Sequence, residues 1–188
     1  MIIAISGKKH SGKSTVAAML SEELGWEVTS FAKKLKEITC VLSGCTMEQL
    51  EDYDFKENTI VPTYLWAYCS GGSKPTYRSF MQWFGTEVMR KRYGNIWIEA
   101  TLENAPSDVI VSDCRFINEA EAITDYNGVI IRVISPLGSS DDLHCSELEI
   151  EDIKPDVIIW NYGNLDELRD KIKELANDVI NCTVKKEY

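Results

Sequence analysis

Short apolar runs alternate with amphipathic stretches along most of this chain. Five runs that are continuous or alternating in apolar residues predict β-strands, at residues 2–5, 26–31, 108–112, 129–134 and 156–160. Elsewhere apolar side chains recur three or four positions apart and predict helices, at residues 16–20, 32–42, 76–93, 96–104, 118–126 and 165–180. This alternation predicts an α/β fold with a mostly parallel central sheet and helices on both faces.

Two stretches interrupt the alternation. Residues 43–105 hold an acidic, partly helical segment and a Gly-, Ser- and Pro-rich segment, and we expect them to form a helical excursion from the core. Residues 135–153 are polar and lie between the last two strands, where we expect a lid. A chain of 188 residues fits a single domain over residues 1–188. The predicted buried face of residues 32–42 is Leu35, Ile38, Val41 and Leu42.

Composition narrows the range of partners. The formal net charge of −10 argues against a protein that coats nucleic acid, because that binding needs many Lys and Arg side chains against the phosphates. No apolar run approaches the roughly 20 residues that span a bilayer, so we expect no membrane partner. The six cysteines show no C-x-x-C spacing, which favours reduced thiols. The chain opens on a core strand, which predicts a cytoplasmic protein.

The first strand runs into a phosphate-binding loop. Gly7 and Gly12 stand at the first and sixth positions of a G-x-x-x-x-G-K-S pattern that Lys13 and Ser14 complete before a helix. The glycines let backbone N–H groups face a polyphosphate, and the helix adds the positive end of its dipole. Lys13 would reach the outer phosphates of ATP, and Ser14 would ligate the Mg²⁺ that bridges them. The predicted ATP-binding residues of the loop are Gly7, Lys8, Lys9, His10, Ser11, Gly12, Lys13, Ser14 and Thr15.

Further candidates follow other predicted strands. Asp113 would hold Mg²⁺ directly or through water, or it caps a helix or turn. Arg115 would clamp a transferring phosphoryl group, or it pairs with Glu119 on the surface. Asn161 would edge the adenine of ATP, or it belongs only to a turn. The predicted catalytic residues are Lys13, Asp113 and Arg115, and the predicted metal ligands are Ser14 and Asp113.

Polar side chains of two predicted helices could bind an acceptor. One stripe recurs at every fourth residue of the helix over 76–93, in which Gly85 is a weak point: Arg78, Gln82, Thr86 and Arg90. Such a stripe is either a binding surface or a solvated face. Three lysines after the second strand would bind an acceptor phosphate or water: Lys33, Lys34 and Lys36.

Three ring-bearing side chains have two interpretations each. Trp83 and Trp97 either stack on a base or belong to the core. His144 lies in the polar segment, and a lone histidine is more often structural or exposed, so it is not assigned as a catalytic base.

Five segments of the chain match one family pattern in the same order. They are the loop at residues 7–15, S-F-A-x-x-L-K at 30–36, R-x-x-x-Q-x-x-G-T-[DE] from residue 78 with Arg90 after it, V-x-D-x-R-F-x-N-E at 111–119, and H-x-[ST]-E at 144–147. In this order they resemble deoxynucleoside monophosphate kinases of the bacteriophage type, within the nucleoside monophosphate kinase family. Many nucleotide-binding families share the loop, so the other four segments make the match specific.

The resemblance implies a three-layer P-loop kinase fold that transfers the γ-phosphate of ATP to a deoxynucleoside monophosphate, with ATP and Mg²⁺ as cofactors. It implies a phosphate clamp at Arg115 and a substrate-binding excursion over residues 43–105. The implied substrate-binding residues are Phe31, Lys33, Lys36, Arg78, Gln82, Trp83, Gly85, Thr86, Arg90 and Trp97. We expect no general base, because the acceptor phosphate is already an anion.

The residues leave two other functions open. A kinase of another small phosphorylated acceptor, such as phosphomevalonate or dephospho-coenzyme A, would share the loop and Asp113 but show no preference among nucleobases. A non-catalytic nucleotide sensor or assembly protein would bind ATP without transfer, and it would not need a second phosphate clamp. We expect the partner to be a small nucleotide and not a nucleic-acid polymer. The sequence leaves open whether the chain forms a homodimer. If the chain is viral, the expected location is the cytoplasm of the host.

Overall fold

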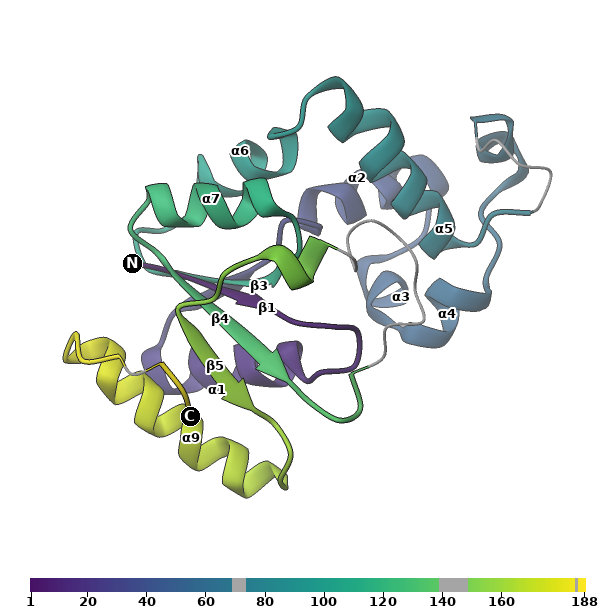
Figure 1. Cartoon of the computed structure of the whole chain (residues 1–188). Helices are drawn as coiled ribbons and strands as arrows, with labels where there is room; N and C mark the ends of the chain where they lie inside the picture. The colour runs from purple at the N-terminus through teal and green to yellow at the C-terminus, as the bar shows by residue number, and fades with distance from the viewer. Residues whose placement is uncertain (69–73, 139–148, 185) are drawn as a thin grey trace. The chain divides into compact units, whose positions relative to one another are not determined.

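The computed structural model describes residues 1–68, 74–138, 149–184 and 186–188 (Figure 1). These residues form two compact units, each with its own apolar core. Unit 1 joins Met1–Phe31 to Thr101–Tyr188, and unit 2 is the segment Ala32–Ala100. Unit 2 therefore contains most of the predicted helical excursion, whereas the arrangement of the whole chain as one domain stays a prediction.

A five-stranded sheet forms the centre of unit 1. Its strands follow the order β2-β3-β1-β4-β5, and each neighbouring pair is parallel. The strands are β1 (Ile2–Ser6), β2 (Glu27–Thr29), β3 (Val109–Cys114), β4 (Val129–Ile134) and β5 (Val157–Trp160). Each overlaps one of the five predicted strands, so the prediction of an α/β fold with a mostly parallel sheet is confirmed.

Helices cover both faces of this sheet. Helices α1 (Lys13–Leu24) and α9 (Leu165–Ile180) pack against each other on one face, and α7 (Ile117–Asp125) lies against β1 and β4 on the other (Figure 1). A short 3₁₀-helix, η3 (Glu149–Asp152), precedes β5. The core on the α1 and α9 side consists of apolar side chains from both helices and the strands, among them Ile3, Ile5, Val16, Leu20, Ile131, Leu168 and Ile172.

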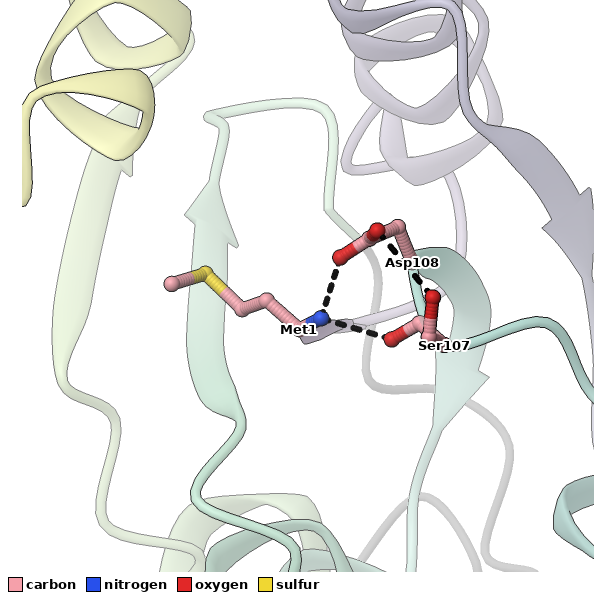
Figure 2. Close-up of polar contacts among 3 residues, drawn as sticks. All are labelled: Met1, Ser107 and Asp108. Carbon is pink, nitrogen blue, oxygen red and sulfur yellow. Dashed lines mark hydrogen bonds and ion pairs between the residues drawn. The ribbon is translucent and has the colours of Figure 1, made fainter.

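The start of β1 is tied to the turn before β3. The amino group of Met1 donates a hydrogen bond to the carbonyl oxygen of Ser107 at 2.6 Å and pairs with the carboxylate of Asp108 (Figure 2). The N–H of Val109 donates to the carbonyl oxygen of Met1 at 3.1 Å. These contacts support the register in which Ile2 lies opposite Val109. The hydrogen bond from the ammonium also lowers the pKa of the Asp108 carboxyl.

Unit 2 is helical in its described residues. Its elements are α2 (Lys33–Ser43), α3 (Met47–Glu51), α4 (Tyr53–Asn58), the 3₁₀-helix η1 (Thr63–Tyr68), α5 (Tyr77–Gln82), the π-helix η2 (Trp83–Arg90) and most of α6 (Ile96–Leu102). Its core consists of Leu50, Val61, Leu65, Tyr77, Phe80 and Met81. Across the described parts of both units, no helix has the length and apolar character needed to cross a bilayer.

The helix predicted over residues 76–93 changes type in the middle. It is an α-helix as far as Gln82 and then continues as a π-helix, whose i→i+5 hydrogen bonds make a wider turn. Gly85 lies buried in this wider turn, where an added β-carbon would stand 2.7 Å from Cδ2 of Leu35. The indole N–H of Trp97 donates to the carbonyl oxygen of Gly85 at 3.1 Å. The glycine thus permits close packing within unit 2.

The predicted buried face of α2 is only partly correct. Leu35 packs against the core of unit 2, but Val41 is 84% exposed and Leu42 is 39% exposed. The fully buried position is Thr39, whose hydroxyl donates to the carbonyl oxygen of Leu35 at 2.8 Å. Because that hydrogen bond satisfies the hydroxyl inside the helix, a polar residue can occupy the buried face.

Candidate active site

Two glycines shape the loop between β1 and α1. Gly7 has φ 148° and Gly12 has φ 98°, a region that other residues rarely adopt. A β-carbon on Gly7 would lie 2.5 Å from the carbonyl oxygen of Val133, and one on Gly12 would lie 2.5 Å from Nδ2 of Asn161. Both the conformation and the available space therefore require glycine at these two positions, as the phosphate-loop pattern predicts.

Lys13 folds back over the loop. Its ammonium donates to the carbonyl oxygens of Gly7 at 2.7 Å and Lys8 at 2.6 Å, and its side chain is 9% exposed. A lysine would lose hydration when it is buried, and these two carbonyl contacts compensate for that loss. The ammonium is thus held above the same backbone that a polyphosphate would contact.

The first turn of α1 also faces the loop. Val16 makes the first amide-to-carbonyl bond of the helix, to Gly12 at 3.0 Å, so the preceding N–H groups point out of the helix end with the positive end of its dipole. Ser14 is exposed on this turn. The hydroxyl of Ser11 is buried and has no hydrogen-bond partner among the described residues. This end of α1 can therefore receive an anion with several oxygen atoms.

The carboxyl ends of three strands meet at the loop. Ser6, the last residue of β1, lies opposite Cys114 of β3 and Arg132 of β4. The end of β3 at Cys114 therefore lies beside the start of the phosphate loop, because parallel strands end at the same edge of the sheet. This register brings Asp113 and Arg115 to the edge where sequence reasoning placed them.

Asp113 already has one structural contact. Its Oδ1 accepts a hydrogen bond from the N–H of Phe31 at 2.7 Å, and the carboxylate is half-buried. Phe31 is 2% exposed, so this bond fixes the end of the segment after β2 to the end of β3. The two predicted roles of Asp113, metal ligand and turn-forming residue, are compatible because a carboxylate has two oxygen atoms.

The backbone of Arg115 is fixed by Glu119. The buried Glu119 carboxylate accepts hydrogen bonds from the N–H groups of Arg115 at 2.8 Å and Phe116 at 3.1 Å. Glu119 is 1% exposed, so it is not the surface partner that the sequence suggested. It instead satisfies backbone donors just before α7, as acidic residues do at helix N-termini.

Asn161 joins the end of β5 to the phosphate loop. Its side-chain amide donates to the carbonyl oxygen of Ser11 at 3.0 Å, and its backbone N–H donates to Ile134 at 2.8 Å. It is half-buried and follows Trp160 directly. Asn161 therefore contacts the loop itself, and its predicted role beside adenine stays a prediction.

Both described ends of the predicted lid reach the phosphate loop. A β-carbon on Gly138 would lie 3.6 Å from Cβ of Lys8 and 3.7 Å from Cβ of Ser11. On the other side, the carboxylate of Glu151 in η3 forms an ion pair with Lys8 at 2.5 Å. The hydrogen bond from Lys8 lowers the pKa of Glu151. His144 lies outside the described residues.

Arg132 anchors the 3₁₀-helix that carries Glu151. Its guanidinium donates to the carbonyl oxygens of Ile150 and, at 2.6 Å, Ile153. Arg132 is the polar residue of an otherwise apolar strand, and burial lowers its pKa. The arginine thereby holds η3 against β4, at the same strand end as the loop.

In unit 2, two of the predicted acceptor-binding cations are paired with carboxylates. Arg78 pairs with Glu57, and Lys36 pairs with Glu51 at 2.6 Å. Lys33 is exposed at the start of α2. The remaining members of the polar stripe, Gln82, Thr86 and Arg90, are all half-buried.

Trp83 and Trp97 lie in the packed interior of unit 2. Trp83 is half-buried, packs against the core of the unit and stands 6.1 Å, between ring centroids, from Phe80. Trp97 is 4% exposed and bonded to Gly85. These positions agree with the core interpretation that the sequence allowed, and base stacking stays a prediction for both.

Sequence reasoning missed three acidic residues with contacts to the candidate site residues. They are Glu51 in α3, Glu57 in α4 and Glu151 in η3, which pair with Lys36, Arg78 and Lys8 respectively. Their positions in the sequence give no signal of this, because a charged run is usually a solvated face.

The oxygen atoms at this site suit a magnesium ion that arrives with a nucleotide. Ser14 offers an exposed hydroxyl, and Asp113 offers a half-buried carboxylate. Among the described residues, no group of three or more His, Cys, Asp or Glu side chains could hold a metal by itself. Mg²⁺ usually takes one or two protein oxygens and completes its shell with phosphates and water, so this donor set fits.

The comparisons with known proteins agree with this geometry. The family model described as deoxynucleotide monophosphate kinase matches residues 44–172. A protein of Acanthamoeba polyphaga mimivirus, named "Putative deoxynucleotide monophosphate kinase", is 31% identical over 189 residues, which cover 92% of this chain and 94% of the viral protein. Among solved structures, shikimate kinase from Acinetobacter baumannii in complex with shikimate is similar with a TM-score of 0.53 and 15% identity, over 98% of this chain and 95% of that one. The last similarity shows the P-loop kinase fold alone. This chain belongs to the deoxynucleotide monophosphate kinase family.

Proposed function

We propose that this protein transfers the γ-phosphate of ATP to a deoxynucleoside monophosphate, with the phosphate loop of unit 1 holding the donor. Family membership makes the chain a nucleoside monophosphate kinase. The observation that carries the proposal is the register of β1 against β3, in which Ser6 lies opposite Cys114. A loop that fits a polyphosphate therefore starts beside a carboxylate and an arginine, which is the set of groups that phosphoryl transfer needs.

Lys13 neutralises the β- and γ-phosphates in this proposal. Its ammonium is held 2.7 Å from the carbonyl oxygen of Gly7, within the loop that receives the nucleotide. A bound phosphate would replace these carbonyl contacts with stronger, charge-assisted ones. The stabilisation grows as charge shifts onto the outer oxygens in the transition state, so Lys13 lowers the barrier as well as binding ATP.

Ser14 and Asp113 hold Mg²⁺ in this proposal. The bound ion would neutralise charge on the donor phosphates. The N–H of Phe31 anchors one oxygen of the Asp113 carboxylate, and in this proposal the carboxylate also holds the ion directly or through water. Ser14 offers its hydroxyl from the exposed first turn of α1.

Arg115 clamps the phosphoryl group during transfer. The buried Glu119 carboxylate holds the Arg115 backbone N–H at 2.8 Å, so the arginine projects from a fixed point at the end of β3. A guanidinium matches the oxygens of a phosphoryl group with two parallel hydrogen bonds. Because Arg115 is already held in position, less entropy is lost when its guanidinium binds the phosphoryl group in the transition state.

The segment over residues 135–153 closes over the donor in this proposal. Its described ends support this role, because Gly138 packs beside Lys8 and Glu151 pairs with Lys8. Closure would exclude water, which prevents hydrolysis of ATP and strengthens the electrostatic contacts. Asn161 would border the adenine from the end of β5.

The polar side chains of unit 2, together with Phe31, contact the acceptor nucleotide in this proposal. Lys36 and Arg78 would bind its phosphate, and the pairs with Glu51 and Glu57 hold both cations in place. The other proposed contacts are Lys33, Gln82, Trp83, Gly85, Thr86, Arg90 and Trp97. We also propose that the enzyme acts in the cytoplasm, that of the host if the chain is viral, and that its partners are small nucleotides, with a homodimer open.

The direct test is ADP release from ATP and Mg²⁺ with different acceptors. Each deoxynucleoside monophosphate, each ribonucleotide, phosphomevalonate and dephospho-coenzyme A would be supplied in turn, with Lys13→Ala as the inactive control. We expect turnover with deoxynucleotides and a loss of about 100-fold or more in the variant. Turnover only with a non-nucleotide acceptor, or ATP binding without transfer, would contradict the proposal.

A further inference from the structure

Residues 186–188 cover the outer edge of the sheet at β5. The N–H of Ile158 donates to the carbonyl oxygen of Lys186 at 2.8 Å, and the N–H of Tyr188 donates back to Ile158 at 2.9 Å. At the end of β5, the N–H of Trp160 donates to the main-chain oxygen of Tyr188 at 3.1 Å. Figure 1 shows this end of the chain beside β5 and α9. An edge strand without a neighbour leaves such groups unpaired, so residues 186–188 complete the hydrogen bonding of β5 as far as Trp160.

Lys171 of α9 binds the last carbonyl group of this edge. Its ammonium donates to the carbonyl oxygen of Trp160 at 2.7 Å and to the main-chain oxygen of Tyr188 at 3.4 Å. The side chain of Lys171 is half-buried. A charged donor makes a stronger hydrogen bond to a carbonyl oxygen than a neutral donor does. Lys171 is therefore a strong restraint on the end of β5.

The peptide group between Trp160 and Asn161 is held on two sides. Its carbonyl oxygen accepts the hydrogen bond from Lys171 at 2.7 Å, and its N–H donates to the carbonyl oxygen of Ile134 in β4 at 2.8 Å. Because a peptide group is planar and its C=O and N–H point in opposite directions, these two contacts fix its orientation. Helix α9 thus helps to set the direction in which the Asn161 side chain leaves the backbone.

This direction matters for the phosphate loop. The side-chain amide of Asn161 donates to the carbonyl oxygen of Ser11 at 3.0 Å. Its Nδ2 atom is so close to Gly12 that an added β-carbon there would lie at 2.5 Å. A small rotation of the Asn161 backbone would therefore break the hydrogen bond to Ser11 or push the amide against Gly12. Either change would disturb the loop directly before Lys13.

We propose that Lys171 is a positioning residue for the ATP site. It holds the peptide group before Asn161, and Asn161 in turn holds the phosphate loop in the form that receives a polyphosphate. This inference rests on the proposed function and adds to it a residue that acts through another one. All the residues in this series of contacts belong to unit 1, so we expect an effect on the donor and not on the acceptor.

A lysine that only fastens α9 to the sheet would behave differently. Its removal would lower the melting temperature, but the folded molecules would still bind ATP with the wild-type affinity. In our proposal the dissociation constant of the fully folded protein rises, because binding must then also pay the entropy of ordering the loop. The two roles therefore differ in ATP affinity and not in stability.

The test measures the dissociation constant of ATP by titration calorimetry, at a temperature where circular dichroism shows every variant fully folded. Lys171→Met keeps the length of the side chain but removes the donor, and Lys171→Arg restores a charged donor. Lys173→Met, on the exposed surface of α9, is the matched charge control. We expect Lys171→Met to raise the dissociation constant about 10-fold, because the loss of one charge-assisted hydrogen bond is transmitted in part to the loop. Lys171→Arg should stay within about threefold of the wild type, and Lys173→Met should match it.

A double-mutant cycle with Asn161→Ala tests the route of the effect. If Lys171 acts through Asn161, Lys171→Met should weaken ATP binding little further once the Asn161 amide is absent. The KM for each deoxynucleoside monophosphate, measured at saturating ATP, should stay within about twofold of the wild type in Lys171→Met. A general loss of structure would instead change both the donor and the acceptor constants.

An ATP dissociation constant within about twofold of the wild type in Lys171→Met would overturn the inference, whatever the melting temperature. So would losses of ATP affinity that add fully in the double variant, because Lys171 would then act independently of Asn161. Wild-type protein that binds ATP but phosphorylates no deoxynucleotide would contradict the proposed function alone, since the calorimetric comparison needs no turnover. Wild-type protein that binds no ATP would overturn both.

Discussion

The side-chain amide of Asn161 occupies the space that a β-carbon on Gly12 would need, at 2.5 Å. The same amide donates to the carbonyl oxygen of Ser11 at 3.0 Å, so the contact that holds the phosphate loop to the end of β5 requires glycine beside it. Two segments almost 150 residues apart thus fix the shape of one anion site.

Gly12→Ala should weaken nucleotide binding. The substitution adds a β-carbon at φ 98° and against Nδ2 of Asn161, so the loop must open or Asn161 must move. We expect ATP affinity to fall at least about 10-fold, equivalent to about 1.4 kcal/mol, in a titration calorimetry experiment. Gly25→Ala is the matched control, because Gly25 has φ 70° but open space around it. It should cost about 1 kcal/mol of stability and leave ATP binding intact. Equal ATP affinities for the two variants would refute the steric argument.

Glu151→Gln should tighten ATP binding. The Glu151 carboxylate forms an ion pair with the Lys8 ammonium. A phosphate group that approaches the loop would compete with this carboxylate for Lys8. Because the pair is largely exposed, we expect the KM for ATP to fall no more than about fivefold, and less in high salt. Asp152→Asn removes the same charge from the same 3₁₀-helix and should change the KM less.

The effect of Glu151→Gln should also depend on pH. Lys8 lowers the pKa of Glu151, so the carboxyl stays ionised at neutral pH and keeps the pair down to a lower pH than an ordinary glutamate would. The difference between variant and wild type should therefore stay constant around neutral pH and disappear only when the pH falls below the ordinary pKa of a glutamate. A weaker binding of ATP by Glu151→Gln at neutral pH would show that the pair supports the site.

Asp113→Asn should separate catalysis from folding. An asparagine oxygen can still accept the hydrogen bond from the N–H of Phe31, so we expect the melting temperature to stay within about 2 °C of wild type. The loss of charge should lower kcat/KM about 100- to 1000-fold and raise the Mg²⁺ concentration that gives half-maximal activity. Asp113→Ala, which loses the hydrogen bond as well, should also melt a few degrees lower. Wild-type magnesium dependence in Asp113→Asn would exclude this carboxylate as a ligand.

Gly85→Ala should destabilise the chain through overpacking. The added methyl group would lie 2.7 Å from Cδ2 of Leu35, and the carbonyl oxygen of Gly85 already accepts a bond from Trp97. We expect a loss of about 1–3 kcal/mol in urea unfolding. The same substitution in a Leu35→Ala background should cost at least about 1 kcal/mol less, because the clash is gone. Additive costs in the double variant would show that Leu35 is not the obstacle.

Much of unit 1 follows from local patterns in the sequence. Its five strands are apolar runs, and the burial of their side chains sets the register between neighbouring strands. The spacing of glycine, lysine and serine in residues 7–14 specifies the loop, because phosphate binding needs those residue types at those positions. Asp113 and Arg115 were assigned to the loop edge because parallel strands end together, and the pairing of Ser6 with Cys114 puts them there.

The tertiary structure decided the rest, because the partners lie far apart in the chain. The helical periodicity predicted that Val41 and Leu42 lie on the buried face of α2, but both are exposed. The face of a short helix that is buried depends on how the helix packs against other helices. The helix changes to a π-helix after Gln82, and Gly85 in that segment packs against Leu35, 50 positions away. No spacing rule reports such a contact.

The sequence by itself determined the order of elements, the phosphate loop and the family, because these depend on short apolar runs and on residues within about ten positions of each other. Only the tertiary structure brought Lys36 to Glu51, Arg78 to Glu57 and Lys8 to Glu151. Charge interactions act through space, and a linear sequence records the identity of each charge but not its distance from the others.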